Sequence, residues 1–223
     1  MSEKVNEAFN NLRLGFKFSL ITVILIISYA ILCLKDFFVY LLFPFGLPFF
    51  LLLFTWAYGL IKRHVGWSLL NQRRITKALS FGGIMLFIFL FLPATSWIYP
   101  IIYHSDLSLF SIPIYATILI PPIAWGIYTW MENRGFRRLK QNYGINLASA
   151  RICNLIGILV YYSTYVVLYL LAYSHIYFDF IPYFYVPISP FLIVSFLFAS
   201  PFLIASCIFA IIELGAERNG EKK

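Results

Sequence analysis

The sequence of 223 residues is 61% hydrophobic and 12% charged, and its formal net charge is +8. In a soluble domain about a quarter of the residues are charged, so this composition excludes an ordinary water-soluble protein. The three cysteines form no C-x-x-C pair, and we interpret them as small buried hydrophobic residues.

Six stretches of the chain lack Asp, Glu, Lys, Arg and His altogether. They cover residues 18–34, 37–61, 78–103, 107–131, 152–174 and 180–212. A helix needs about 20 apolar residues to cross the hydrocarbon layer, and a helix satisfies its own backbone hydrogen bonds in lipid. The sequence therefore predicts an all-α, polytopic membrane protein with one membrane domain, residues 1–223. Six transmembrane helices are expected at about residues 16–34, 38–61, 79–102, 109–131, 151–174 and 188–212.

Lysines and arginines are distributed unevenly between the connections. The two terminal segments and the second and fourth connections together hold 16 cations, whereas the remaining connections hold 1. Short loops rich in Lys and Arg stay in the cytoplasm. Both termini are therefore predicted to be cytoplasmic, in a multi-pass protein of the cell membrane.

Two basic connectors, residues 62–77 and 132–151, hold five cations each. We expect both to lie in the membrane interface, with Trp67 and Phe136 as anchors at headgroup level. Nucleic acid is not expected as a partner, because no folded soluble module stands behind the cations. The expected partner is the bilayer, and these residues are expected to contact its anionic headgroups: Arg73, Arg74, Lys77, Arg137, Arg138 and Lys140.

One short pattern occurs three times. The segments "AFNNLRLG" at 8–15, "GWSLLNQR" at 66–73 and "GFRRLKQN" at 135–142 each contain a small residue, an aromatic, two spacers and a leucine. Each precedes a span that runs outward, so the chain is predicted to form three helical hairpins in the same, parallel orientation. Two interpretations of the pattern stay open, namely an internal duplication and convergent interfacial anchoring.

Longer stretches around these motifs carry a family resemblance. They are "NNLRLGFKFSLI" near the start, "GWSLLNQRRITKALSFGGIML" at 66–86 and "GFRRLKQNYGINLASARICNLIGIL" at 135–159. The chain resembles an uncharacterised family of archaeal multi-spanning membrane proteins of the thermoacidophile type. It departs from that pattern in the order Asn142-Tyr143, which the family reverses, and in spans rich in Phe and Tyr. The resemblance implies a similar topology in an archaeal membrane and implies no activity.

Polar residues near or in the spans provide two further candidate sites. On the fifth span Asn154, Tyr161 and Tyr165 either hydrogen-bond to a neighbouring helix or line a polar pathway. The outer connections contain Asp36 and the candidate metal ligands His104, Asp106, His175 and Asp179. These five residues form a metal site, form a mouth that attracts cations, or simply serve as ordinary turn residues.

The sequence predicts no enzyme, no catalytic residue and no cofactor, because it contains none of the common catalytic motifs and no ionisable residue in mid-span. The favoured function is a structural or accessory membrane subunit that packs beside a partner or another copy of the chain. The alternative is a small channel or transporter whose pathway runs between proline-kinked helices. The prolines concerned are Pro44, Pro48, Pro121, Pro122, Pro190 and Pro201.

Overall fold

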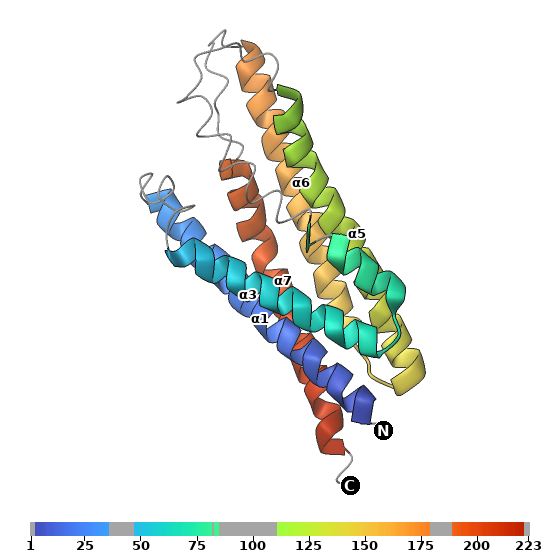
Figure 1. The fold of residues 1–223 in the computed structure, drawn as a ribbon. Coiled ribbons are helices and arrows are strands. Elements are labelled where there is room, and N and C mark those ends of the chain that lie inside the picture. The colour runs from blue at the N-terminus through green and yellow to red at the C-terminus, as the bar shows by residue number, and fades with distance from the viewer. Residues whose placement is uncertain (1–2, 36–46, 82, 85–110, 179–188, 221–223) are drawn as a thin grey trace.

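The structure is a computed structural model that describes residues 3–35, 47–81, 83–84, 111–178 and 189–220 (Figure 1). Most of these residues are helical and none is in a strand, which confirms the all-α prediction for this part of the chain. A helical segment also covers residues 73–81. The long helices are α1 (Glu3–Lys35), α3 (Leu47–Leu69), α5 (Ser111–Tyr143), α6 (Ala148–Phe178) and α7 (Ser189–Gly220).

Four of these helices are longer than a membrane crossing requires. Helices α1, α5, α6 and α7 contain 31 to 33 residues, which corresponds to a length of about 50 Å at the α-helical rise. In the described part of the chain, two helical stretches are long and apolar enough to cross a membrane, Glu3–Tyr29 and Val194–Gly215. The six expected spans are therefore confirmed only as helix, where the structure describes them.

The basic connectors begin as continuations of the long helices, and their predicted location in the membrane interface stays a prediction. Helix α3 continues to Leu69 and α5 continues to Tyr143, so each connector begins as several further helical residues. A turn of residues 70–72 follows α3, and residues 144–147 join α5 to α6. The physical reason is cooperativity, since extending an existing helix costs less than starting a new one.

Both helix ends are formed by residues in the left-handed backbone region. Asn71 has φ 57° and donates its N–H to Ser68 O at 2.9 Å, while Gly144 has φ 77° and donates to Lys140 O at 3.1 Å. Glycine and asparagine are the residues that most readily adopt this conformation after a helix. Each connector therefore contains its own local signal for where the helix stops.

Helix α1 packs against both α3 and α7, and α6 packs against α7 and α5. In Figure 1 the beginning of α1 and the end of α7 lie at the same end of the molecule. The α1–α3 crossing uses small residues, because a Cβ built on Gly15 would lie 2.9 Å from Gly59 O and Arg63 N. Small residues allow helix backbones to approach this closely.

Replacing Gly15 by alanine is expected to lower the free energy of unfolding by about 1–3 kcal/mol, because the new methyl group would meet backbone atoms that cannot rotate away. Gly83→Ala is the matched control, since among the described residues its Cβ would meet only Leu60 Cδ1, at 3.4 Å. Both variants are compared by thermal unfolding in detergent. Equal midpoints for the two would contradict the close crossing of α1 and α3.

Candidate functional site

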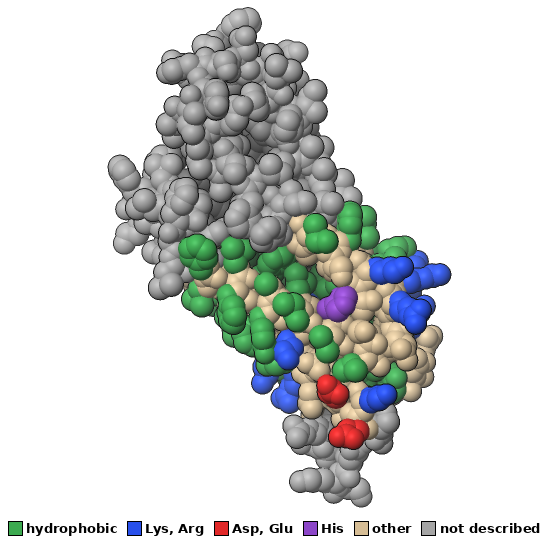
Figure 2. All heavy atoms as spheres, viewed as in Figure 1, with side chains coloured by type: hydrophobic (Ala, Val, Ile, Leu, Met, Phe, Trp, Pro, Cys, Tyr) green, Lys and Arg blue, Asp and Glu red, His purple; other side chains and the backbone are tan. Residues whose placement is uncertain are grey.

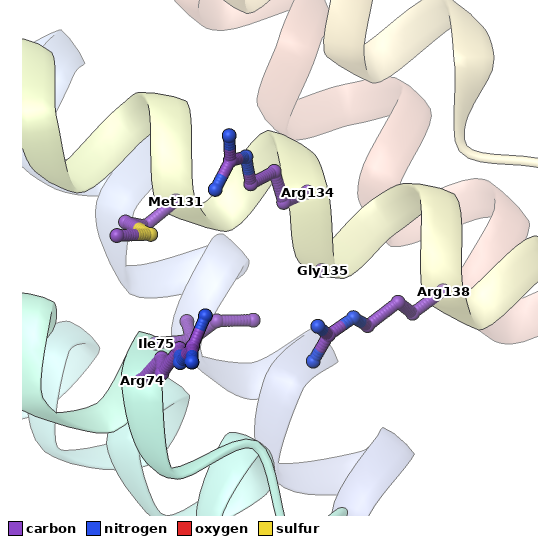
Figure 3. Close-up of a pocket in the computed structure, with 6 residues that line it drawn as sticks. All are labelled: Arg74, Ile75, Met131, Arg134, Gly135 and Arg138. Atoms are coloured by element: carbon purple, nitrogen blue, oxygen red, sulfur yellow. The ribbon is translucent and has the colours of Figure 1, made fainter.

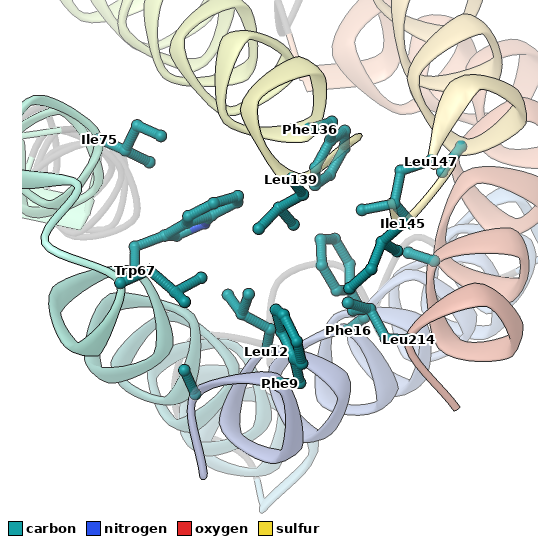
Figure 4. Packing of buried hydrophobic residues seen from close by; sticks show 14 of the residues in the cluster. Phe9, Leu12, Phe16, Trp67, Ile75, Phe136, Leu139, Ile145, Leu147 and Leu214 are labelled. Carbon is teal, nitrogen blue, oxygen red and sulfur yellow. The ribbon is translucent and has the colours of Figure 1, made fainter. Parts of the chain in front are cut away.

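The three repeated motifs meet in one buried cluster, which we call the motif core. Their aromatic and leucine side chains are buried in the same hydrophobic cluster (Figure 4). These residues are Phe9 and Leu12 on α1, Trp67 at the end of α3 with Leu70 in the turn that follows, and Phe136 and Leu139 on α5. The spacing of three residues from aromatic to leucine places both side chains on one face of a helix. The pattern thus marks the face of each segment that points inward.

The glycine of the second motif and that of the third each give room for a neighbouring motif. A Cβ built on Gly66 would lie 2.6 Å from Leu12 Cγ, and one built on Gly135 would lie 2.6 Å from the Trp67 ring. The first motif therefore packs on the second, and the second packs on the third. This packing gives the small–aromatic–x–x–leucine pattern a structural reason that neither requires nor excludes a duplication.

Trp67 and Phe136 are core residues, which corrects their assignment as interfacial anchors. Trp67 is 0% exposed and Phe136 is 2% exposed, and their ring centroids lie 6.1 Å apart. Phe136 also contacts Phe16 of α1 at 5.8 Å between centroids. An anchor at headgroup level needs a ring at the protein surface, and packing between the helices has placed these two rings inside.

A carboxylate lies beside the motif core. Glu132 of α5 is 0% exposed, and it pairs with Arg63 of α3 through both carboxylate oxygens. Arg63 Nε donates to Glu132 Oε1 at 2.9 Å, and Arg63 Nη2 donates to Oε2. Trp67 Nε1 donates to Oε1 at 3.2 Å, and Tyr128 Oη donates to Oε2 at 2.8 Å. Four donors thus occupy the about four acceptor positions of this carboxylate.

The guanidinium of Arg63 is held equally firmly. Its Nη1 donates to Ser19 Oγ of α1 at 3.2 Å, and its Cζ lies 4.6 Å from the ring centroid of Phe16 and 4.9 Å from that of Tyr128. Planar stacking on aromatic rings and bidentate pairing are the two interactions for which arginine is best suited. Three helices, α1, α3 and α5, therefore contribute side chains to a single ion pair.

This arrangement fits a structural ion pair better than a reactive group. A carboxylate that accepts four hydrogen bonds has no free position at which to remove a proton from a substrate. Removing one partner of such a pair leaves the other charge buried without compensation, at a cost of several kcal/mol. We therefore interpret the buried pair of Arg63 and Glu132, which we call the electrostatic lock, as an interaction that favours one packing of α1, α3 and α5 over others.

The ion pair was not predicted, because both residues stand just outside the charge-free runs and were assigned to the connectors. One signal was present: Glu132 is the sole acidic residue among the ten cations of the two connectors. A single carboxylate in such surroundings indicates a specific partner among those cations. The sequence could not identify that partner, since Arg63 lies 69 residues away.

The candidate headgroup residues are exposed, and two of them line a pocket. Arg74 and Arg138 join Arg134, Ile75, Met131 and Gly135 around a shallow hollow between α5 and the helical segment 73–81 (Figure 3). The four others are exposed outside this pocket: Arg73, Lys77, Arg137 and Lys140. The structure also reveals Trp130, which is 50% exposed and carries the guanidinium of Arg134 over its ring at 3.7 Å.

The remaining candidates are only partly described. Tyr161 packs with Ala199 and Leu203 of α7 in a second, smaller cluster, and Asn154 is half-buried on α6. The side chain of Tyr165 lies outside the described part of the structure. So do the outer residues Asp36, His104, Asp106 and Asp179 and the side chain of His175. The predictions made for them therefore stay predictions.

Comparisons with protein-family models, curated proteins and solved structures find no match to this chain. The resemblance to the archaeal membrane family therefore stays a prediction based on its three motifs.

Proposed function

We propose that the chain is a multi-pass membrane protein with both termini in the cytoplasm, which acts as a structural or accessory subunit without a catalytic site. The observation that carries this proposal is the outward apolar surface of its helices. Large hydrophobic side chains are exposed on every long helix, examples being Ile24, Phe54, Ile127, Leu159 and Phe198. A soluble protein rarely exposes so many large apolar residues.

The distribution of side chains in space supports the same proposal. In Figure 2, hydrophobic side chains cover the part of the described surface next to the grey region, while Lys and Arg gather toward the right and lower edges. Six spans with the cations on the cytoplasmic side would produce this separation. The ends of α1 and α7 that lie together would then both be cytoplasmic, as proposed.

Two hydrogen bonds join side chains of one helix to a neighbouring helix. Thr22 Oγ1 of α1 donates to Thr55 Oγ1 of α3 at 3.2 Å, and Ser206 Oγ of α7 donates to Ala150 O of α6 at 2.8 Å. Membrane helices associate through such bonds and close packing, because apolar side chains gain little by leaving lipid. These contacts favour a bundle whose function is to hold a defined shape beside lipid or a partner.

A channel or transporter is the second candidate, and a specific observation favours it. Asn133, Thr129 and Ser195 are buried, and their side-chain polar atoms have no hydrogen-bond partner among the described residues. Unpaired buried polar groups are unusual in proteins. Thr129 and Asn133 lie on α5, which also carries Glu132, and Ser195 lies on α7. A line of water molecules through the bundle would satisfy them, and this is the pathway that the second candidate requires.

A cysteine accessibility scan separates the two candidates. Single cysteines at Thr129, Asn133 and Ser195 are placed in a chain without Cys33, Cys153 and Cys207, and a charged thiol reagent is added to inside-out vesicles, whose cytoplasmic face is exposed. For the structural subunit we expect labelling at least about tenfold slower than at Arg73→Cys, because buried side chains are screened from water. Rapid labelling at all three positions would replace the structural proposal by the channel.

The same vesicles test the orientation. Arg73→Cys and Arg137→Cys, both exposed, are expected to react with an impermeant reagent only from the cytoplasmic side. Labelling of either from the opposite side would contradict the proposed topology.

A further inference from the structure

The pocket between α5 and the helical segment 73–81 is lined by three arginines, and their positive charge favours a negatively charged ligand. Arg134 and Arg138 lie one helical turn apart on α5, and Arg74 lies on the facing segment. In Figure 3, Arg138 reaches from α5 toward the segment that carries Arg74 and Ile75. Like charges gathered around one hollow repel each other, and a bound anion would remove that repulsion.

None of the three arginines has an acidic partner in the described part of the chain, where the ion pair of Arg63 and Glu132 is the one that the structure shows. Arg138 Nη1 donates to Gln72 Oε1 at 2.6 Å, which directs its guanidinium without neutralising it. The guanidinium of Arg134 is stacked on the ring of Trp130. Stacking leaves the N–H groups of Arg134 able to donate hydrogen bonds in the plane of the guanidinium. Two of the three guanidiniums are therefore oriented, and all three keep donors.

We infer that this pocket binds a phosphate group, carried by a lipid headgroup or by a free anion. Guanidinium groups match phosphate oxygens in pairs, and several arginines around one hollow are the common way to recognise them. Ile75 and Met131 contribute apolar side chains to the lining of the same hollow. The site depends on the pocket alone and does not depend on the number of spans or on the structural role proposed above.

The site differs from general attraction of cations to an anionic surface. Arg73 and Arg137 are exposed and stand next to pocket residues in the sequence, yet they do not line the pocket. A diffuse electrostatic effect would use them equally. A phosphate site uses Arg74, Arg134 and Arg138 and is indifferent to these two.

The test compares two double variants with the same loss of charge, Arg74→Gln with Arg138→Gln for the pocket and Arg73→Gln with Arg137→Gln as the matched control. Each purified protein, freed of lipid in an uncharged detergent, is titrated by calorimetry with dioctanoyl phosphatidic acid and, separately, with inorganic phosphate. Dioctanoyl phosphatidylcholine is the zwitterionic comparison. The wild type and the control are expected to bind a phosphate probe within about twofold of each other, and the pocket variant about tenfold or more weakly, since each lost charge-assisted bond removes a factor of this order.

Binding of phosphatidic acid alone assigns the site to a lipid headgroup, whereas binding of inorganic phosphate and its competition with the lipid assign it to a soluble anion; both results support the site. Absence of binding by the wild type, or equal weakening in both double variants, would overturn it. Should the pocket variant unfold, the single variants Arg74→Gln and Arg73→Gln make the same comparison, because neither side chain has a hydrogen-bond partner among the described residues.

Discussion

Replacing Glu132 by glutamine is expected to lower the free energy of unfolding by about 3–5 kcal/mol, although the two side chains have almost the same shape. The single amide oxygen can keep the bond from Trp67 Nε1 or the one from Tyr128 Oη, which end on different oxygens of Glu132, because the other position becomes an NH2 donor. The charge of Arg63 is then buried without a counter-charge, and this makes the largest contribution to the loss of stability. For a chain of this length the thermal midpoint should fall by roughly 10 °C.

The measurement uses a buried thiol of the protein itself. Cys207 is 8% exposed and belongs to the motif core, so a thiol-reactive dye reports unfolding in a chain in which Cys33 and Cys153 are replaced by serine. Glu7→Gln is the matched control, since Glu7 is exposed on α1 and should change the midpoint by less than about 2 °C.

A second substitution distinguishes the charge effect from a loss of shape. Arg63→Met added to Glu132→Gln removes the uncompensated charge and should restore a large part of the lost stability. The thermodynamic cycle of the two single variants and the double variant measures the coupling directly. Purely additive effects of the two substitutions would mean that the lock does not exist.

The second large effect is expected for Trp67→Ala, which should lower the free energy of unfolding by about 3–5 kcal/mol because the substitution empties the centre of the motif core. Among the described residues, Trp67 is the largest of the fully buried side chains. It contacts Gly135 and Phe136 and donates a hydrogen bond to Glu132. Trp67→Phe keeps most of the packing and loses the donor, so a smaller loss of about 1–2 kcal/mol is expected.

Trp130→Ala is the control that decides between core and interface. Trp130 is half exposed and stacks with Arg134, so its removal should cost at most about 1 kcal/mol. Both tryptophan variants are followed by the Cys207 reporter and by tryptophan fluorescence with lipid-phase quenchers. If Trp67 is quenched from the lipid headgroups as strongly as Trp130, the anchor originally predicted from the sequence is correct and the burial in the motif core is not.

The motif pattern allowed part of the candidate site to be predicted from the sequence. Its spacing placed an aromatic and a leucine on one face of each of three helices, and all six side chains are indeed buried together. The spacing could not say what that face meets. Membrane interface and helix neighbour both favour an aromatic ring, so the sequence pattern of Trp67 and Phe136 was compatible with either.

The sequence by itself determined the helical class and the separation of apolar runs from basic connectors, because composition and charge act locally and are visible in any stretch of about 20 residues. Only the tertiary structure decided that Arg63 pairs with Glu132 and that three arginines of two segments share one pocket. These arrangements join residues that are distant in the chain, and the angle at which two helices cross selects them. That angle depends on close contacts such as the one that Gly135 of α5 makes with the side chains of Trp67 and Ile75, which no local pattern encodes.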